Sequence, residues 1–327
     1  MKPKKTKEVL STTGQVISYI SEENEDVKLD QAIKKVLSLK PILACILKEV
    51  VDECKNLTEE EVIQSIEGEP EINEVPLVEI QGQSQEDSQD GTDLVRYDIR
   101  TYIKLSNVEK PELAKILINV EAQKDDKPGY DIPTRAIFYC CRMVSSELNT
   151  EFTNHQDDPK KYQNIKKVYS IWVCSNTAQC RANSVDKYSI KRDTILGTNN
   201  DHPRYDLFNA VIVNISKNHD TKGSENKMIK VLTDLLNSDL SSSNKIEALK
   251  SDGIKVTEEI EEGVEDMCTY TASVKSESEA KGRAEGRLEG ALQKGIQIYH
   301  NMRKRGISKE EALAIADIPA DAIKDEE

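Results

Sequence analysis

The sequence predicts an α/β protein, with a sheet flanked by helices and a helical C-terminal extension, on the strength of three observations. Residues 94–103 and 115–123 alternate between apolar and polar side chains, as strands with one polar face do. "KVYSIWVCS" at 167–175 and "FNAVIVNIS" at 208–216 are nearly continuous apolar runs of strand length, which is typical of strands covered on both faces. Helical periods lie before, between and after these segments.

The composition indicates a globular domain with solvated appendages. Of 327 residues, 37% are hydrophobic and 32% are charged, and the formal net charge is −14. Such a charge excludes a protein that coats nucleic acid by bulk electrostatics, so any DNA contact requires a local basic patch. No stretch approaches the roughly 18 apolar residues of a membrane span, and no apolar segment follows the basic start. We therefore expect a cytoplasmic protein with no membrane partner, and reduced, mostly buried thiols at the seven cysteines, which form no CxxC pair.

In the N-terminal part, the sequence predicts a flexible arm at 1–25 and three short helices before residue 70. Two helices come from "DQAIKKVLSLKPILACILKEVVDECK", which is broken near Pro41, and a third from "NLTEEEVIQSIE" at 56–67. Thr58 stands three residues before Glu61, the spacing of a capping box. Residues 68–91 are rich in polar and acidic side chains and predict a loop or a weakly structured edge.

A helix is expected from Pro133 to about Phe152, since proline suits the first helical turn. Its helical spacing predicts an apolar stripe on one side and a polar stripe on the other. The apolar stripe comprises Ile137, Cys141, Val144 and Leu148, and the polar one Arg135, Tyr139, Arg142 and Ser146.

The C-terminal third predicts further helices. Residues 222–270 contain three short amphipathic pieces, and "GRAEGRLEGALQKG" then repeats glycine every four residues at Gly282, Gly286 and Gly290. No strand precedes this repeat, so we interpret it as a polar helix with a stripe of small residues, not as a phosphate loop. Each glycine costs about 1 kcal/mol relative to alanine, so this helix frays unless a partner supports it. Ser308 and Glu311 form a second capping-box pattern in the tail.

Glu121 ends an apolar strand, where a buried carboxylate costs several kcal/mol unless it is compensated. The strands at 94–103 and 115–123 are joined by a short connection and predict an antiparallel hairpin that brings Asp98 and Glu121 together. Two interpretations are open. The carboxylates share an Mg²⁺ whose remaining positions are filled by water, or Glu121 forms a buried ion pair with an arginine, namely Arg96, Arg100 or Arg135.

The order of these residues resembles the PD-(D/E)XK nuclease superfamily: an Asp in one strand, Glu-x-Gln in the next, then a helix and another strand. The segments "AIKKVLSLKPILACILKEVVDE", "IQSIEGEPEI", "RYDIRTYI", "INVEAQKDDKPGYDIPTRAIFYCCRMVSSEL" and "IKKVYSIWVCSN" together resemble the PD-(D/E)XK nuclease family transposases, relatives of the recombination-promoting nucleases. The similarity covers roughly residues 28 to 220, and the Gly-Arg-Glu tail is also similar to tails of that group.

The resemblance implies a restriction-endonuclease-like core with a mixed sheet, and a metal-dependent DNA endonuclease belonging to a mobile element. It places the catalytic and metal-binding carboxylates at Asp98 and Glu121, with the backbone carbonyl of Ala122 as a further metal ligand. The family's lysine position falls on Gln123, a neutral amide that orients a water but supplies no charge. Lys124 follows it and points to the opposite face of a strand. A glutamate ahead of the first strand matches Glu86.

The implied cofactor is Mg²⁺, with Mn²⁺ as the expected substitute, and the implied partner is DNA. Arg135, Tyr139 and Arg142 would hold the phosphate backbone, or else they form structural pairs with the acidic strands. The alternative hypothesis is a nuclease fold without turnover that works as a DNA-binding or assembly module; if the chain is a homo-oligomer, we expect the contact at its C-terminal helices. The implied organisation is an arm at 1–25, a nuclease-like domain at 26–220, a helical subdomain at 221–272, the repeat helix at 273–304 and a short helical tail at 305–327.

Overall fold

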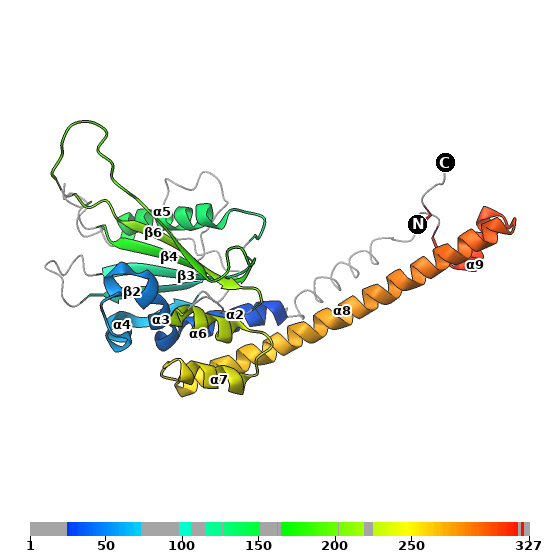
Figure 1. Ribbon diagram of the computed structural model, residues 1–327, viewed down its shortest axis with the longest axis horizontal. Helices are drawn as coiled ribbons and strands as arrows, with labels where there is room; N and C mark the ends of the chain where they lie inside the picture. Colours follow the sequence, from blue (N-terminus) through cyan, green and yellow to red (C-terminus); the bar gives the residue numbers. More distant parts are fainter. Residues whose placement is uncertain are drawn as a thin grey trace, which may run out of the picture. The chain divides into compact units, whose positions relative to one another are not determined.

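The computed structural model describes residues 25–72, 98–105, 115–125, 127–150, 162, 165–201, 203–218, 225–319 and 322–323. The arm expected at 1–25 lies outside the described residues except for its last position. Within these described ranges, six strands form one mixed sheet in the order β1-β2-β3-β4-β6-β5 (Figure 1). The predicted α/β architecture with a sheet flanked by helices is confirmed.

The strands predicted at 115–123, 167–175 and 208–216 and in the described part of 94–103 are present, whereas the strand at 66–72 lies where the sequence predicts the end of a helix and a loop or weakly structured edge. Their bounds are β1 Ile66–Ile72, β2 Ile99–Lys104, β3 Lys115–Asp125, β4 Lys167–Thr177, β5 Ser184–Ser189 and β6 Phe208–Ser216. β1 pairs antiparallel with β2 and β2 with β3, whereas β3, β4 and β6 run parallel. The carboxyl ends of β3, β4 and β6 therefore meet at one edge of the sheet.

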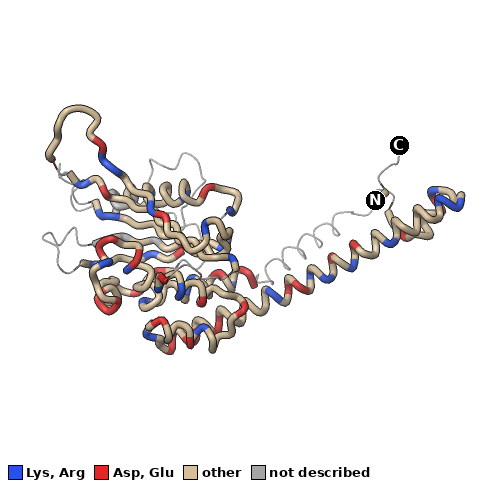
Figure 2. The backbone as a smooth tube through the Cα atoms, in the orientation of Figure 1, with Lys and Arg blue, Asp and Glu red and all other residues tan. Residues whose placement is uncertain are grey.

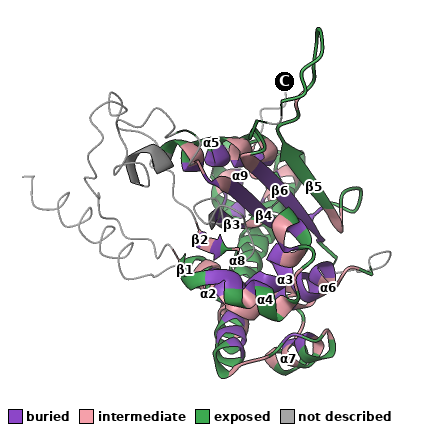
Figure 3. Cartoon of the chain, turned by 90° about the vertical axis from the view of Figure 1, so that its left-hand side faces the viewer, coloured by how far each residue is buried: buried purple, intermediate pink, exposed green. Residues whose placement is uncertain are grey.

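The edge strand β5 was not predicted. It pairs antiparallel with β6, and all of its residues after Ser184 are exposed, as Figure 3 shows by its colour beside the buried β4 and β6. A strand exposed on both faces has no apolar alternation, so its sequence carries no strand period.

The helices before the sheet agree with expectation, apart from one boundary. They are α2 Glu25–Ser38, α3 Lys40–Val50, the 3₁₀ turn η1 Asp52–Cys54 and α4 Glu59–Ser65. The capping box is confirmed, because the Thr58 side chain accepts from the Glu61 backbone N–H and the Glu61 carboxylate accepts from the Thr58 backbone N–H. The third helix ends at Ser65 rather than at Glu67, where β1 has already begun.

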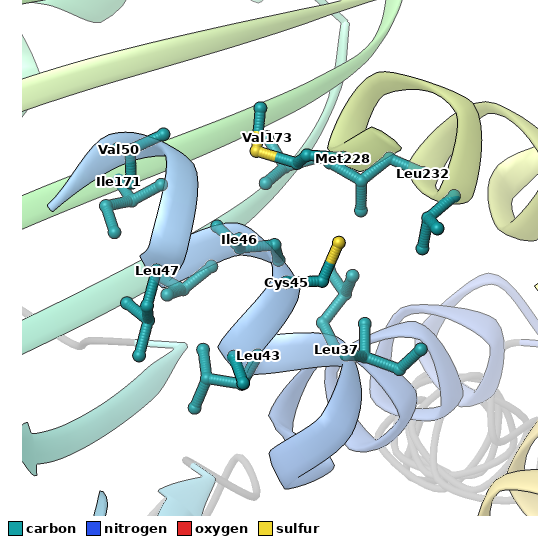
Figure 4. Packing of buried hydrophobic residues seen from close by; sticks show 14 of the residues in the cluster. Leu37, Leu43, Cys45, Ile46, Leu47, Val50, Ile171, Val173, Met228 and Leu232 are labelled. Atoms are coloured by element: carbon teal, nitrogen blue, oxygen red, sulfur yellow. The ribbon is translucent and has the colours of Figure 1, made fainter. Parts of the chain in front are cut away.

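The sheet is covered on both faces (Figure 1). Helix α5, Ile132–Thr150, packs on one face against β4 and β6, and α2, α3 and α6, Lys227–Leu236, lie on the other. The larger core lies on the second face, where side chains of α3 such as Ile46 fill the space between β4 and α6 (Figure 4). A smaller core around Trp172 lies under α5.

The stripe predicted for the helix at 133–152 is wrong. Cys141 is exposed, and Ile137 and Val144 are only partly buried. The side chains that face the sheet are Ile132, Ala136, Tyr139, Cys140 and Met143, of which Tyr139 had been placed on the polar side. The helix is therefore rotated by about one residue from the prediction.

The chain separates into two compact units, Met1–Tyr270 and Thr271–Glu327. In the first unit, α7, Ser242–Ser251, packs beside α6, and the start of α8, Glu258–Lys304, lies against α2, with Ile260, Val264 and Met267 buried in the larger core. The third of the three short pieces expected in 222–270 is therefore the beginning of a 47-residue helix. No helix in the described part of the chain is long and apolar enough to cross a membrane.

The second unit has a small core of its own. Helix α9, Lys309–Ala316, folds back onto the end of α8, and Tyr299, Ala312, Ala316 and Ile318 are buried together. Gly295 makes this possible, since a Cβ there would lie 2.9 Å from the carbonyl oxygen of Ala316 and would overlap the Ile318 side chain.

Candidate functional site

The β2–β3 register brings the two predicted carboxylates together. Ile99 pairs with Val120, so Asp98 stands opposite Glu121 just before β2 begins. The Asp98 N–H donates to Glu121 Oε1 at 3.1 Å, and the Ala122 N–H donates to Asp98 Oδ2 at 3.1 Å. Each carboxylate thus accepts from the other strand, and the predicted antiparallel hairpin is confirmed.

Glu121 is buried at the carboxyl end of β3. It is 6% exposed and follows Val120, whose side chain lies in the larger core. Because strand side chains alternate between faces, Glu121 faces the α5 side of the sheet. Ligands of open α/β sheets bind at such strand ends, and this one carries two carboxylates.

A lysine that the sequence did not single out completes this group. Lys34 Nζ lies 2.8 Å from Asp98 Oδ1 and 2.6 Å from Asp30 Oδ2, and Lys34 is only 8% exposed. Burial by itself lowers the pKa of Lys34, but hydrogen bonds and charges from Asp30 and Asp98 outweigh it and raise the pKa above its ordinary value. The site therefore contains a permanent ammonium, supplied by helix α2.

Gln123 is held by the segment that follows β3. It is partly exposed, and its Oε1 accepts from the Tyr130 hydroxyl at 3.1 Å. Lys124, in contrast, is 72% exposed. Its side chain is therefore no substitute at the position of Gln123, as the strand period predicts.

On α5, Arg135 is enclosed by aromatic rings. Its guanidinium lies 4.7 Å from the ring centre of Tyr130 and 5.6 Å from that of Trp172, and Nη2 donates to the Tyr139 hydroxyl at 2.8 Å. Burial alone lowers the pKa of Arg135, but the hydrogen bond to Tyr139 and the charge of Glu121 are among the effects that raise it overall. Arg135 thus adds positive potential on the Glu121 side of the site.

The other two residues predicted to bind DNA do not share that position. Tyr139 is 4% exposed, with its ring 5.3 Å from Trp172, and so belongs to the core under α5. Burial, then the charge of Glu121, raises the pKa of its hydroxyl, which stays neutral. Arg142 is exposed. The three residues therefore do not form one basic surface.

Of the remaining expectations, Glu86 and Arg96 lie outside the described residues. Arg100, another arginine considered as a partner of Glu121, donates from Nη2 to the Tyr102 hydroxyl at 3.0 Å. Among the residues that the structure describes, no group of three or more His, Cys, Asp or Glu side chains is arranged to hold a metal ion. The donor set at the strand ends is the pair Asp98 and Glu121.

Lys34 could have been found from one signal. It stands four residues after Asp30 and three before Leu37, so a charged side chain lies on the buried side of an amphipathic helix. A buried lysine requires an acidic partner, but its sequence position does not say which one.

Comparison of the chain with protein-family models, with curated proteins and with solved structures finds no match in any of the three.

Proposed function

We propose that this chain is a metal-dependent DNA endonuclease of the PD-(D/E)XK type, associated with a transposase or recombination-promoting nuclease of a mobile element. One observation carries the proposal: Asp98 and Glu121 meet at the carboxyl end of β3 and are tied to each other's strands by hydrogen bonds of 3.1 Å. Because each carboxylate accepts from a backbone N–H of the other strand, the sheet itself holds both carboxylates in place.

The donor set fits a small divalent cation. Magnesium in phosphoryl-transfer sites is commonly held by one or two carboxylates together with waters and substrate phosphates. Lys34 is shared between Asp30 and Asp98, and Arg135 acts on Glu121, so among these described residues three carboxylates face two cations and the net negative charge still attracts a cation. Asp98 and Glu121 would hold Mg²⁺ or Mn²⁺, with the Ala122 carbonyl as the further ligand that the resemblance implies. The ion, when bound, supplies Lewis-acid activation of water and of the phosphoryl group.

The chain's own side chains supply positioning and charge. Gln123, held by Tyr130, orients the attacking water at the edge of the site. Lys34 carries the positive charge that a glutamine cannot, and it reaches the site from α2 rather than from β3. Arg142 is exposed on α5 and contacts the phosphate backbone of DNA.

A second candidate function rests on the same lysine. Because the Lys34 ammonium already neutralises Asp98, the site is satisfied without a metal, as in a nuclease fold that serves only as a DNA-binding or assembly module. The two functions make opposite predictions for the removal of Lys34.

The first experiment measures plasmid cleavage by the full chain with Mg²⁺, with Mn²⁺ and with EDTA. We expect nicking with either metal, no nicking in EDTA, and no nicking by Asp98→Asn or Glu121→Gln. Thermal unfolding of each variant in the presence of EDTA shows that it is folded. Equal cleavage by wild type and Glu121→Gln would overturn the assignment.

The second experiment compares Lys34→Met with Lys35→Met, a neighbouring lysine on the same helix that is half exposed and pairs with Asp266. In an endonuclease, Lys34→Met loses cleavage but keeps the metal-induced rise in melting temperature, and Lys35→Met keeps both. In a binding module, wild type neither cleaves DNA nor responds to metal, and Lys34→Met acquires a metal-dependent rise because Asp98 loses the ammonium that balances its charge.

A further inference from the structure

Helix α8 contains a segment that is exposed all round and has a repeating sequence. Every residue from Lys275 to Lys294 is exposed. Within it the chain repeats glycine, a basic residue, an apolar residue and an acidic residue as Gly282-Arg283-Ala284-Glu285 and Gly286-Arg287-Leu288-Glu289, followed by Gly290-Ala291-Leu292-Gln293. Charges of both signs alternate along α8 in Figure 2.

A four-residue repeat on a helix produces four stripes. Because an α-helix has 3.6 residues per turn, each step along the chain turns by about 100°, so every fourth residue is offset by about 40° and each stripe winds slowly around the helix. The apolar stripe, Ala284, Leu288 and Leu292, therefore has arginines on one flank and glutamates on the other. The glycines lie opposite the apolar stripe.

The apolar stripe is a surface without a partner in the described chain. Leu288 is 73% exposed and Leu292 is 38% exposed. Leu288 lies between Gly286 and Gly290, and Leu292 follows Gly290, so both leucines stand where glycine weakens the helix. Association through this stripe removes the leucines from water and supports the helix at its weakest point. Association through the glycine stripe would leave both leucines exposed.

The flanking charges select the partner and its direction. If two copies of the helix pack in parallel through the apolar stripe, a two-fold axis runs along the seam, and the arginine flank of one copy lies beside the glutamate flank of the other. If they pack antiparallel, the axis crosses the seam, and arginines lie beside arginines and glutamates beside glutamates. Like charges in contact oppose association, whereas opposite charges at flanking positions set partner and orientation.

We propose that residues 280–294 of α8 pair in parallel with the same segment of a second copy of this chain, through Ala284, Leu288 and Leu292. Arg283 and Arg287 face Glu285 and Glu289 of the other copy on one flank, and the symmetry repeats the arrangement on the other. The pairing does not depend on the chemistry proposed at Asp98 and Glu121.

The test measures the mass of the full chain by analytical ultracentrifugation. We expect twice the 36.8 kDa of one chain for wild type. The variant Leu288→Gln and the variant Arg283→Glu/Arg287→Glu should each be monomeric. A mixture of Arg283→Glu/Arg287→Glu with Glu285→Arg/Glu289→Arg should form a mixed dimer, although neither associates alone. The matched control is Gly286→Ala, whose new Cβ meets nothing within 4 Å and should leave the dimer intact.

Orientation is tested by Leu292→Cys, which lies next to its own equivalent only in the parallel arrangement. Oxidation should link Leu292→Cys chains into covalent dimers beyond the level of wild type, which already carries seven cysteines. A monomeric wild type, a dimer that survives Leu288→Gln, a dimer lost in Gly286→Ala, or the absence of the crosslink would each overturn the proposal.

Discussion

At the scale of single residues, Glu121 shows how the site tolerates a carboxylate that is only 6% exposed. The Asp98 N–H donates to it, and the charge of Arg135 on α5 acts on it. Lys34, however, contacts Asp98 and not Glu121 in its ion pair. The two carboxylates are therefore compensated differently, although they are adjacent in space.

This difference predicts unequal effects of removing each charge without metal. Glu121→Gln retains an oxygen that can accept from the Asp98 N–H, and it loses both the repulsion from Asp98 and the attraction of Arg135, so in EDTA it should melt close to the temperature of wild type. Asp98→Asn weakens the ion pair of the buried Lys34, leaving Asp30, and should cost about 1–3 kcal/mol. Thermal unfolding of both variants in EDTA gives the comparison. A strongly destabilised Glu121→Gln would indicate a buried ion pair with an arginine instead.

The residues of the site differ in how far the sequence could predict them. Asp98 and Glu121 could be brought together because their strands are neighbours along the chain and their register follows from alternation. Lys34 could not be assigned to Asp98, because that contact depends on how α2 packs beside the strand ends. Tyr139 was predicted on the polar side of α5 because the sequence does not determine how that helix is rotated about its axis. Packing of Tyr139 against Trp172 determines it.

The cysteines allow a test of the core. Burial raises the pKa of Cys45, Cys54 and Cys140 to about 12, so their reactive thiolates are scarce at pH 8, whereas Cys141 and Cys180 are exposed. Brief treatment with iodoacetamide should label Cys141 and Cys180 and spare the other three, as read by peptide mass spectrometry. Labelling of all five should follow only in denaturant. Native labelling of Cys45 at the rate of Cys180 would contradict the packing in Figure 4.

At the scale of whole elements, the patterns that succeeded were those with a single strong period. β4 and β6 were predicted as strands because buried central strands are apolar throughout. Helix α5 has apolar side chains at Ala136, Ile137, Tyr139, Cys140 and Cys141, which surround much of its circumference, so several stripes fitted equally well. Its actual orientation follows from the small Ala136 and Cys140 packing against the sheet.

Two glycines of α8 should respond oppositely to alanine. At Gly295 a Cβ would press on the Ala316 carbonyl oxygen and Ile318, so Gly295→Ala should loosen α9 at a cost of about 1–3 kcal/mol. At Gly286 the space is open, so Gly286→Ala should strengthen the helix by about 1 kcal/mol. Hydrogen exchange should accelerate in peptides from 296–318 for the first variant and slow in peptides from 278–294 for the second. Equal behaviour of the two variants would show that α9 does not pack on Gly295.

At the scale of the whole molecule, the division at Tyr270 separates two kinds of stability. The first unit rests on a continuous core that extends into the start of α8 through Ile260, Val264 and Met267. The described part of the second has the small core around Tyr299 and Ala312 and an exposed helical segment. The chain as a whole has a net charge of −14, but the charges of its repeat segment alternate in sign. This alternation suits pairing between copies of the segment rather than binding of a polyanion.

Truncation tests this division, because the position of the cut decides which core is lost. A chain ending at Tyr270 keeps Ile260, Val264 and Met267 and should unfold within about 2 °C of the full chain, since a change of 1 kcal/mol shifts the melting temperature of a domain of this size by roughly that much. A chain ending at Thr257 lacks these three side chains and exposes the pocket that they fill. Burial of each contributes about 1.5–3 kcal/mol, and the total rivals the stability of a whole domain, so this chain should lose cooperative unfolding.

The chain ending at Tyr270 should also be monomeric and retain metal-dependent plasmid nicking, because the site and the pairing segment lie in different units. A folded but inactive chain would mean that cleavage requires the second unit, and an insoluble one would mean that the first unit does not stand alone.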